Sequence, residues 1–248
     1  MNRKVKVEIC VESLESALIA QEAGAGRIEL CSDLLEGGLT PSPGLTKLAV
    51  NNLKIPVNVL VRPRAGDFFY SDTDFEVMME DIKIAKEYNA NGVVLGILKS
   101  DGAIDIDRMK KLIEAAKPLS ITFHRAFDMT IDPFEALESL IELGVDRILT
   151  SGQATSAYEG RRLIKKLVEK ANGRLNIMPG GSINHSNAKE IVDECDVTEI
   201  HSSASEKISS KMIYRNETTS MGKKGSLSEY ESRATSAEKV RLLINAIK

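Results

Sequence analysis

Residues 120–144 read SITFHRAFDMTIDPFEALESLIELG and contain every part of one strand, loop and helix unit. The apolar SITF predicts a short buried strand, and polar residues follow directly where it ends. The rest predicts a helix, because Asp132 suits an N-cap, Pro133 the first helical position, Glu135 the capping partner and Gly144 the helix end. The stretch therefore indicates a βα fold whose loops carry polar groups.

The same pattern recurs along the chain. The strand-like runs are KVEIC, RIELC, VNVLVRP, GVVLGIL, ITFHRAF, RILTSG, LNIMPGG and VTEIHSS, with amphipathic helical patterns between them. About eight such units predict an α/β fold of the (β/α)8 TIM-barrel type, as a single domain over residues 1–248. No GxGxxG motif follows the first strand, which argues against a doubly wound open sheet.

Residues 205–235 depart from this pattern, since they are rich in Ser, Lys and Gly. We expect an irregular segment there. On a barrel it would lie over the carboxyl-terminal face, although the composition also suits a flexible linker. Residues 236–248 predict a final helix.

The composition excludes several kinds of partner. A net charge of -3 offers no general basic surface for nucleic acid or anionic lipid, and 4% aromatic residues without Trp provide no base-stacking platform. No apolar run has the length of a membrane span, and the opening MNRKVKVEIC does not resemble a signal peptide. Three cysteines without CxxC spacing favour reduced thiols in a cytoplasmic protein. Assembly into a homo-oligomer remains open.

Alternation along the predicted strands sorts their residues onto two sides. Apolar residues such as Val7, Ile9 and Ile28 would face the helices. The opposite side is polar and includes Lys6, Glu8, Cys10, Arg27, Glu29, Cys31, Asn58, Arg62, Thr122, His124, Arg147, Glu199 and His201. We therefore expect a polar barrel interior, unlike the branched apolar filling usual in such barrels. Either internal ion pairs balance these charges, or those at the strand ends form a site.

The strand within residues 120–123 leads to candidate catalytic residues. If it ends at the barrel rim, His124 points inward while Arg125 and Asp128 occupy the loop above. A histidine there would suit proton transfer, metal ligation or anion binding. The alternative is a structural histidine in a polar core.

Two further motifs suit an anion. Arg62, Arg64 and Asp67 follow the third predicted strand, and paired arginines near a barrel mouth favour bidentate capture of carboxylate or phosphate. After the seventh strand, MPGGSI places Gly180, Gly181 and Ser182 where phosphate sites are common in these barrels. Residues 182–184 also suit a helix start, which would favour an anion. The glycines alone would equally suit a tight turn.

Cys10 and Cys31 end adjacent predicted strands on the same inward side, and His201 lies on the strand that closes the barrel beside them. Two thiolates and an imidazole would suit soft Cu(I), or zinc with a fourth ligand. The alternative is that both thiols pack as small hydrophobes.

The motifs EIC, AGAGRIELCSDLLEGGLTPSPGL, RPRAGDFFYS, TFHRAFD, LGVDRILTSGQ, MPGGSIN and EIHSSA together resemble the CutC copper-homeostasis family, in order and over nearly the whole chain. The resemblance implies a cytoplasmic barrel protein with a role in copper handling. It also implies copper binding at Cys10 and Cys31.

Two functions stay open from the sequence. The first is a copper-homeostasis protein that binds Cu(I) through Cys10 and Cys31. The second is an enzyme that acts on a small anionic substrate, such as a phosphorylated compound, at the barrel mouth. In that alternative His124, Glu8, Glu29, Arg125 and Asp128 would carry catalysis. The anion-binding residues would be Arg62, Arg64, Asp67, Gly180, Gly181, Ser182 and His201.

Overall fold

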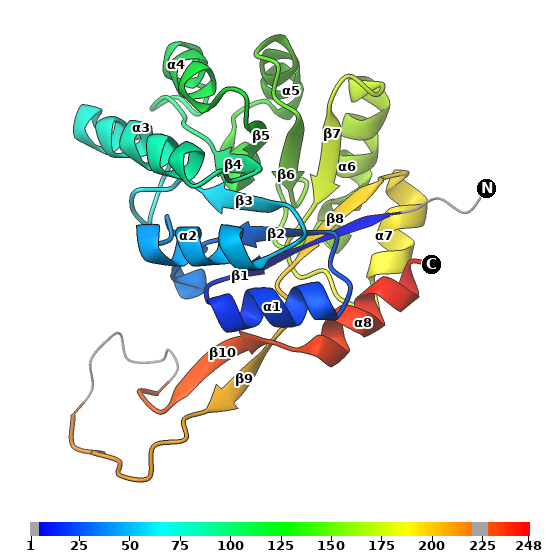
Figure 1. Ribbon diagram of the computed structural model, residues 1–248. Helices are drawn as coiled ribbons and strands as arrows, with labels where there is room; N and C mark the ends of the chain where they lie inside the picture. The colour runs from blue at the N-terminus through cyan, green and yellow to red at the C-terminus, as the bar shows by residue number, and fades with distance from the viewer. Residues whose placement is uncertain (1–4, 220–227) are drawn as a thin grey trace.

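The computed structural model describes residues 5–219 and 228–248, and a ring of eight parallel strands forms its centre. The strands are β1 (Lys6–Val11), β2 (Arg27–Leu30), β3 (Val57–Leu60), β4 (Gly92–Leu95), β5 (Ser120–Phe123), β6 (Arg147–Thr150), β7 (Asn176–Pro179) and β8 (Glu199–Ser202). Their hydrogen-bonded order runs β7-β6-β5-β4-β3-β2-β1-β8. The two end strands of this order, β7 and β8, contact each other and close the ring (Figure 1). We call this boundary the seam.

Helices surround the strands (Figure 1). They are α1 (Leu14–Glu22), α2 (Pro43–Asn52), α3 (Asp72–Glu87), α4 (Ile106–Ala116), α5 (Pro133–Glu142), α6 (Ala157–Ala171), α7 (Ala188–Cys195) and α8 (Ala237–Ala246), with short 3-10 turns η1 (Leu34–Glu36) and η2 (Arg125–Met129). The predicted (β/α)8 TIM barrel is confirmed.

The predicted caps explain where α5 begins and ends. The Asp132 side chain accepts from the backbone N–H groups of Phe134 and Glu135, and Pro133 occupies the first turn. Gly144 follows the helix with φ +74, a left-handed conformation that glycine adopts without steric cost. Local sequence thus sets the length of this unit.

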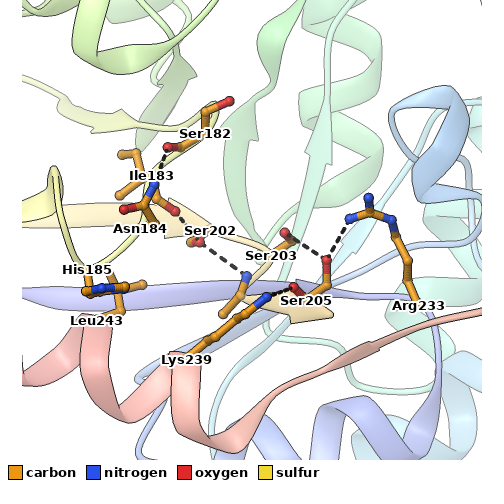
Figure 2. Close-up of a pocket in the computed structure, with 11 residues that line it drawn as sticks. Ser182, Ile183, Asn184, His185, Ser202, Ser203, Ser205, Arg233, Lys239 and Leu243 are labelled. Carbon is orange, nitrogen blue, oxygen red and sulfur yellow. Dashed lines mark hydrogen bonds between the residues drawn. The ribbon is translucent and has the colours of Figure 1, made fainter. Parts of the chain in front are cut away.

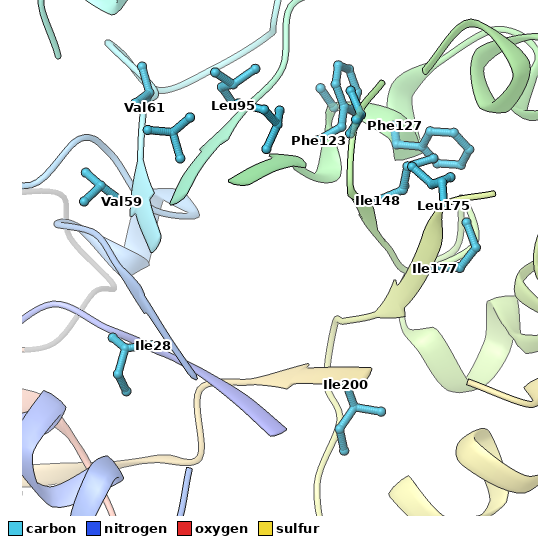
Figure 3. Close-up of a cluster of buried hydrophobic side chains, with 14 of the residues drawn as sticks. Ile28, Val59, Val61, Leu95, Phe123, Phe127, Ile148, Leu175, Ile177 and Ile200 are labelled. Atoms are coloured by element: carbon cyan, nitrogen blue, oxygen red, sulfur yellow. The ribbon is translucent and has the colours of Figure 1, made fainter. Parts of the chain in front are cut away.

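The apolar core lies between the strands and the helices. Figure 3 shows strand residues such as Ile28, Val59, Ile148 and Ile200 pointing outward from the ring. These side chains are almost completely buried. The opposite strand faces bury polar and charged residues, so the predicted polar interior is confirmed, except that Lys6 at the start of β1 is exposed. The set is Glu8, Arg27, Glu29, Asn58, Arg62, Thr122, His124, Arg147, Glu199 and His201.

The segment expected to be irregular has regular structure at both ends. β9 (Ser205–Ser209) and β10 (Glu231–Thr235) form a two-stranded antiparallel ribbon that extends away from the barrel in Figure 1. The backbone N–H of Thr235 donates to Ser16 Oγ at 3.2 Å, which fastens the ribbon to α1. The short, mostly polar strands lack the apolar alternation that identifies a strand from sequence. Residues 220–227 of this segment lie outside the described residues.

In the part of the chain that the structure describes, none of the helices combines the length and apolar character needed to cross a membrane.

Candidate active or metal site in the barrel interior

Strand register arranges the polar interior in levels. Glu8 of β1 lies opposite Arg27 of β2 and opposite His201 of β8. Cys10 lies opposite Glu29, one level nearer the carboxyl-terminal ends of the strands. We call Glu8, Arg27, Arg147 and Glu199 the lower network, and Cys10, Glu29 and His201 the upper cluster.

The lower network is a closed set of ion pairs. Arg27 donates to Glu8 and, at 2.7 Å, to Glu199. Arg147 donates to the same Glu199 oxygen at 3.1 Å. Two buried guanidinium groups are thus matched by two carboxylates, which offsets much of their desolvation cost. The predicted internal balance of charge is therefore observed for these four residues.

The carboxylate of Glu8 connects the two levels. One of its oxygens pairs with Arg27, and the other lies 2.8 Å from His201 Nδ1. Burial by itself would raise the pKa of Glu8, but Arg27 and His201 outweigh this effect and lower it to about 2. Glu8 therefore stays ionised across the neutral range.

Glu29 differs from Glu8, although both are buried glutamates on adjacent strands. Its Oε2 is buried without a hydrogen-bond partner among the described residues. Burial raises the pKa of Glu29 to about 7, and the nearby charge of His201 only partly opposes this shift. A carboxyl group that titrates near neutrality is suited to proton transfer.

His201 is the cationic member of the upper cluster. Burial would lower its pKa, but Cys10, Glu29 and Glu8 together hold the pKa well above the ordinary value. Within residues 5–219 and 228–248, one set of His, Cys, Asp or Glu side chains has the spacing to hold a metal ion. It consists of Glu8, Glu29 and His201, whose ligand atoms all lie within 4.8 Å of one another.

The two predicted copper ligands are both buried free thiols, but their surroundings differ. Cys10 borders His201 in the upper cluster. Cys31 lies beyond the end of β2, packs with Leu60 and Val94, and donates from Sγ to the carbonyl oxygen of Val11 at 3.4 Å. Burial raises the pKa of the Cys31 thiol, and charge on Cys10 adds to the effect. The two thiols are therefore electrostatic neighbours in a largely dry environment.

His124 lies beyond β5 and caps η2, where its Nδ1 accepts from the backbone N–H of Ala126 at 3.2 Å. Its ring packs against Phe68, with 4.9 Å between centroids, and its buried Nε2 has no partner among the described residues. Burial and the charge of Arg62 lower the pKa of His124 to about 3. This histidine is therefore neutral at physiological pH. Its Nδ1 has a structural role as the cap of η2, and its Nε2 takes no part in this role.

Arg62 links the loops around the mouth. Its guanidinium donates to the carbonyl oxygens of Glu36 at 2.7 Å, Gly38 at 2.8 Å and Gly66 at 3.1 Å. It also lies over the Phe68 ring at 5.3 Å. These partners are neutral, so they leave the positive charge of Arg62 available to attract an anion.

Arg64 and Asp67, the other predicted members of this anion site, interact with each other. Arg64 donates to Asp67 at 3.0 Å and to Asp74 at 3.2 Å. Its charge is thus already matched by carboxylates, unlike that of Arg62.

Arg125 and Asp128 also form a pair, at 2.7 Å. Asp128 accepts from the Thr150 hydroxyl and from the backbone N–H of Ser151, while Arg125 reaches the Ser151 hydroxyl at 2.8 Å. These bonds connect the loop after β5 to the end of β6. Through these contacts, the two predicted catalytic residues join neighbouring loops.

The glycines after β7 lie against the seam. A Cβ on Gly180 would come within 2.4 Å of Leu149 Cδ1 and 3.3 Å of His201 Cβ, so a larger residue beside His201 would force these side chains to shift. Gly181 has φ +107, and Ser182 has φ +58 and is exposed. The predicted helix start at residues 182–184 is wrong, because α7 begins at Ala188 after a turn in which Asn184 and Asn187 bond each other.

A pocket of about 300 Å³ lies next to these glycines, between the loops after β7 and β8 and helix α8 (Figure 2). Ser182, Ser202 and Ser203 line it together with Arg233 and Lys239. Lys239 donates to the Ser205 carbonyl oxygen at 2.7 Å. Sequence motifs did not indicate these two cations, because Arg233 and Lys239 come from β10 and α8, which no motif connects to the barrel mouth.

The fold and interior together define the class of the protein as a (β/α)8 barrel with a titratable polar centre near the carboxyl-terminal ends of its strands. The family model described as "CutC family" matches residues 5–206, and the chain belongs to this family. The predicted resemblance is therefore confirmed.

Named relatives agree with this assignment. The chain is 50% identical over 241 residues to the mouse "Copper homeostasis protein cutC homolog", covering 97% of this chain and 88% of that protein. It is 49% identical over 239 residues to a CutC family protein of Parabacteroides distasonis, covering 96% and 98%.

Solved structures confirm the fold. A CutC protein of Streptococcus agalactiae is 37% identical with a TM-score of 0.77, covering 80% of this chain and 98% of that one. A phosphoribosylanthranilate isomerase of Thermotoga maritima reaches a TM-score of 0.58 at 13% identity, covering 98% of each chain, and shows likeness of fold alone.

Proposed function

We propose that this chain acts in copper homeostasis in the cytoplasm, and that it binds Cu(I) through Cys10 and Cys31 with His201 beside them. In this proposal the partner of the chain is a copper ion, and the chain binds neither nucleic acid nor a membrane. The observation that carries the proposal is the position of Cys10, the penultimate residue of β1, which lies inside the barrel next to His201. The names of the relatives supply the link to copper.

The chemistry of these groups suits a soft ion. Thiolate and imidazole ligands favour Cu(I), which does not require the oxygen-rich shell of a hard cation. Burial keeps both thiols away from solvent, and a bound cation would stabilise their deprotonated forms. Charge on Cys10 raises the pKa of the Cys31 thiol, which supports the pairing of these two residues in the proposal.

An anaerobic Cu(I) competition titration against a chromogenic chelator tests this proposal. We expect stoichiometric binding by the parent protein and its loss in the Cys10→Ser/Cys31→Ser double variant. Cys195→Ser is the matched control, because that thiol lies on α7 and donates to the Arg161 carbonyl oxygen. Binding that survives in the double variant would exclude the two thiols as ligands.

A second function is supported by a separate observation, the opposed environments of the ionisable groups at the mouth. Glu29 has a pKa of about 7, whereas His124 is kept neutral beside Arg62. Groups whose pKa values are pushed apart are typical of acid and base catalysis. In this proposal the chain is an enzyme for a small anionic substrate, with Glu29 as proton acceptor and Arg62 as the attracting charge.

Thermal melting in phosphate or sulfate tests the anion-binding half of this proposal. We expect either anion to raise the melting temperature of the parent protein and to have a weaker effect on Arg62→Ala. Arg174→Ala is the control, since its guanidinium pairs with Glu138 on the outer surface. If neither anion shifts the melting temperature of the parent protein, the anion site loses its support.

A further inference from the structure

Glu29 is the interior carboxylate that the lower network leaves out. Arg27 and Arg147 are matched by Glu8 and Glu199, and none of these bonds reaches Glu29. The Glu29 residue is only 6% exposed, and its Oε2 has no partner among the described residues. An ionised oxygen buried in this way is costly unless a positive charge binds it.

Two other potential ligands converge on the same place. Glu8 Oε1 and His201 Nδ1 lie 2.8 Å apart at hydrogen-bond distance, so the two atoms face each other and a metal ion would replace the proton between them. All three residues offer ligand atoms within 4.8 Å of one another. Carboxylate oxygen and imidazole nitrogen bind Zn²⁺ at about 2.0–2.2 Å, so ligands of a shared ion lie up to about 4.4 Å apart. Small side-chain movements would bring the set into range.

We propose that Glu8, Glu29 and His201 form a binding site for a divalent transition-metal ion such as Zn²⁺, with Glu29 supplying the ligand atom that now has no partner. The site lies inside the barrel, against the strands β1, β2 and β8. Gly180 leaves room beside His201 at the seam, where any larger residue would contact the imidazole ring.

The ligand types define which ion fits. One imidazole and two carboxylates form a borderline set that suits Zn²⁺, Mn²⁺ or Fe²⁺ and does not suit soft Cu(I). Three protein ligands also leave a coordination position open for water or a substrate, as in metal sites that perform catalysis. Glu199 offsets the nearby charge of Arg27, which reduces its repulsion of a metal ion.

This site is distinct from the thiol site proposed for Cu(I), although His201 borders both. Besides His201, its ligands are the carboxylates of Glu8 and Glu29, whereas the other site depends on the thiols of Cys10 and Cys31. Variants of His201 would not separate the two sites. Variants of Glu29 and of the cysteines do.

The test is calorimetric titration of chelator-treated full-length protein with Zn²⁺. We expect one ion per chain in the parent protein and binding weaker by about 100-fold in Glu29→Gln, since even outer partners of ligands change affinity by 10–100-fold. Glu29→Gln preserves side-chain size and removes an unpaired charge, so it should fold. Glu190→Gln, a substitution of a surface carboxylate, should bind like the parent protein.

The Cys10→Ser/Cys31→Ser variant completes the experiment. It should retain Zn²⁺ affinity, and Co²⁺ bound to the parent protein should show no thiolate-to-cobalt charge-transfer absorption. The inference is overturned if the parent protein binds no Zn²⁺, if Glu29→Gln binds it equally well, or if the double cysteine variant loses it. Failure of Cu(I) binding leaves all three of these readouts unaffected, so the two proposals can fail separately.

Discussion

The lower network and the upper cluster meet where Glu8 contacts His201, yet similar side chains behave differently in them. In the lower network, Glu199 accepts from both Arg27 and Arg147. In the upper cluster, Glu29 retains a buried oxygen without a partner among the described residues. The pKa of Glu8, which belongs to the lower network, falls to about 2, whereas that of Glu29 rises to about 7.

This difference teaches that burial of charge does not identify a functional site. Buried charged groups with matched partners stabilise the fold. A buried ionisable group without a matched partner remains able to bind a ligand or transfer a proton. Four substitutions test the comparison.

The largest effect is expected for Glu199→Ala in the lower network. Without this carboxylate, Arg147 loses its charged partner in the network, and Arg27 keeps only the carboxylate of Glu8. Breaking a buried pair in this way should lower the free energy of unfolding by about 3 kcal/mol. Urea denaturation measures it, and a loss below about 1 kcal/mol would show that the network contributes little.

His124→Ala extends the comparison to the opposite side of the mouth. Loss of a buried ring and of the η2 cap should cost about 2 kcal/mol. The pKa of His124 falls from 6.5 to about 3, so its contribution is present above pH 6.5 and is lost as the pH falls toward 3. Denaturation at several pH values should show this loss in the parent protein and not in the variant. An unchanged stability would indicate that His124 serves function alone.

Glu29→Gln should have a smaller effect, of opposite sign. The pKa of Glu29 rises from 4.5 to about 7, so the carboxyl destabilises the metal-free fold progressively as the pH rises through this window. At pH 8 the variant should be more stable by about 1 kcal/mol or more, and near pH 4.5 the two proteins should be equal. A variant less stable at pH 8 would mean that Glu29 has a favourable partner.

Arg125→Ala should have the smallest effect. Its side chain is 44% exposed, and Asp128 keeps its bonds to Thr150 and Ser151 when the arginine is removed. Solvent screening limits such a pair, so the free energy of unfolding should change by about 0.5 kcal/mol. A loss of unfolding free energy as large as that expected for Glu199→Ala would show that Arg125 stabilises the fold as much as the lower network does.

Much of this architecture follows from the sequence. Period-two alternation predicts the polar interior because strand geometry alone decides which side a residue faces. The cap at Asp132 is likewise local. The pairing within the interior is not local, since it depends on how eight strands are staggered. Sequence alternation places Glu8 and Glu29 on the same side, but it does not indicate that Arg27 binds Glu8 and Glu199 and leaves Glu29 unpaired.

The outer features were harder to predict for a related reason. The ribbon of β9 and β10 is held by backbone pairing between polar strands. Arg233 and Lys239 both bond to Ser205, just after β8, because β10 pairs back onto β9 and leads into α8 (Figure 2). Neither arrangement has a periodic signal, so both became visible only in three dimensions.

The pairing of β1 with β8 has a consequence for synthesis of the protein. Lys6 is in register with Glu199, and Glu8 with His201, so β1 can pair on this side only after β8 has been synthesised. A ribosome makes the chain from its amino end, and Arg27 and Arg147 emerge long before the Glu199 that joins them. Arg27 and Arg147 therefore lack their shared acceptor until translation is nearly complete, and an incomplete barrel of this kind is more prone to aggregate than the finished one.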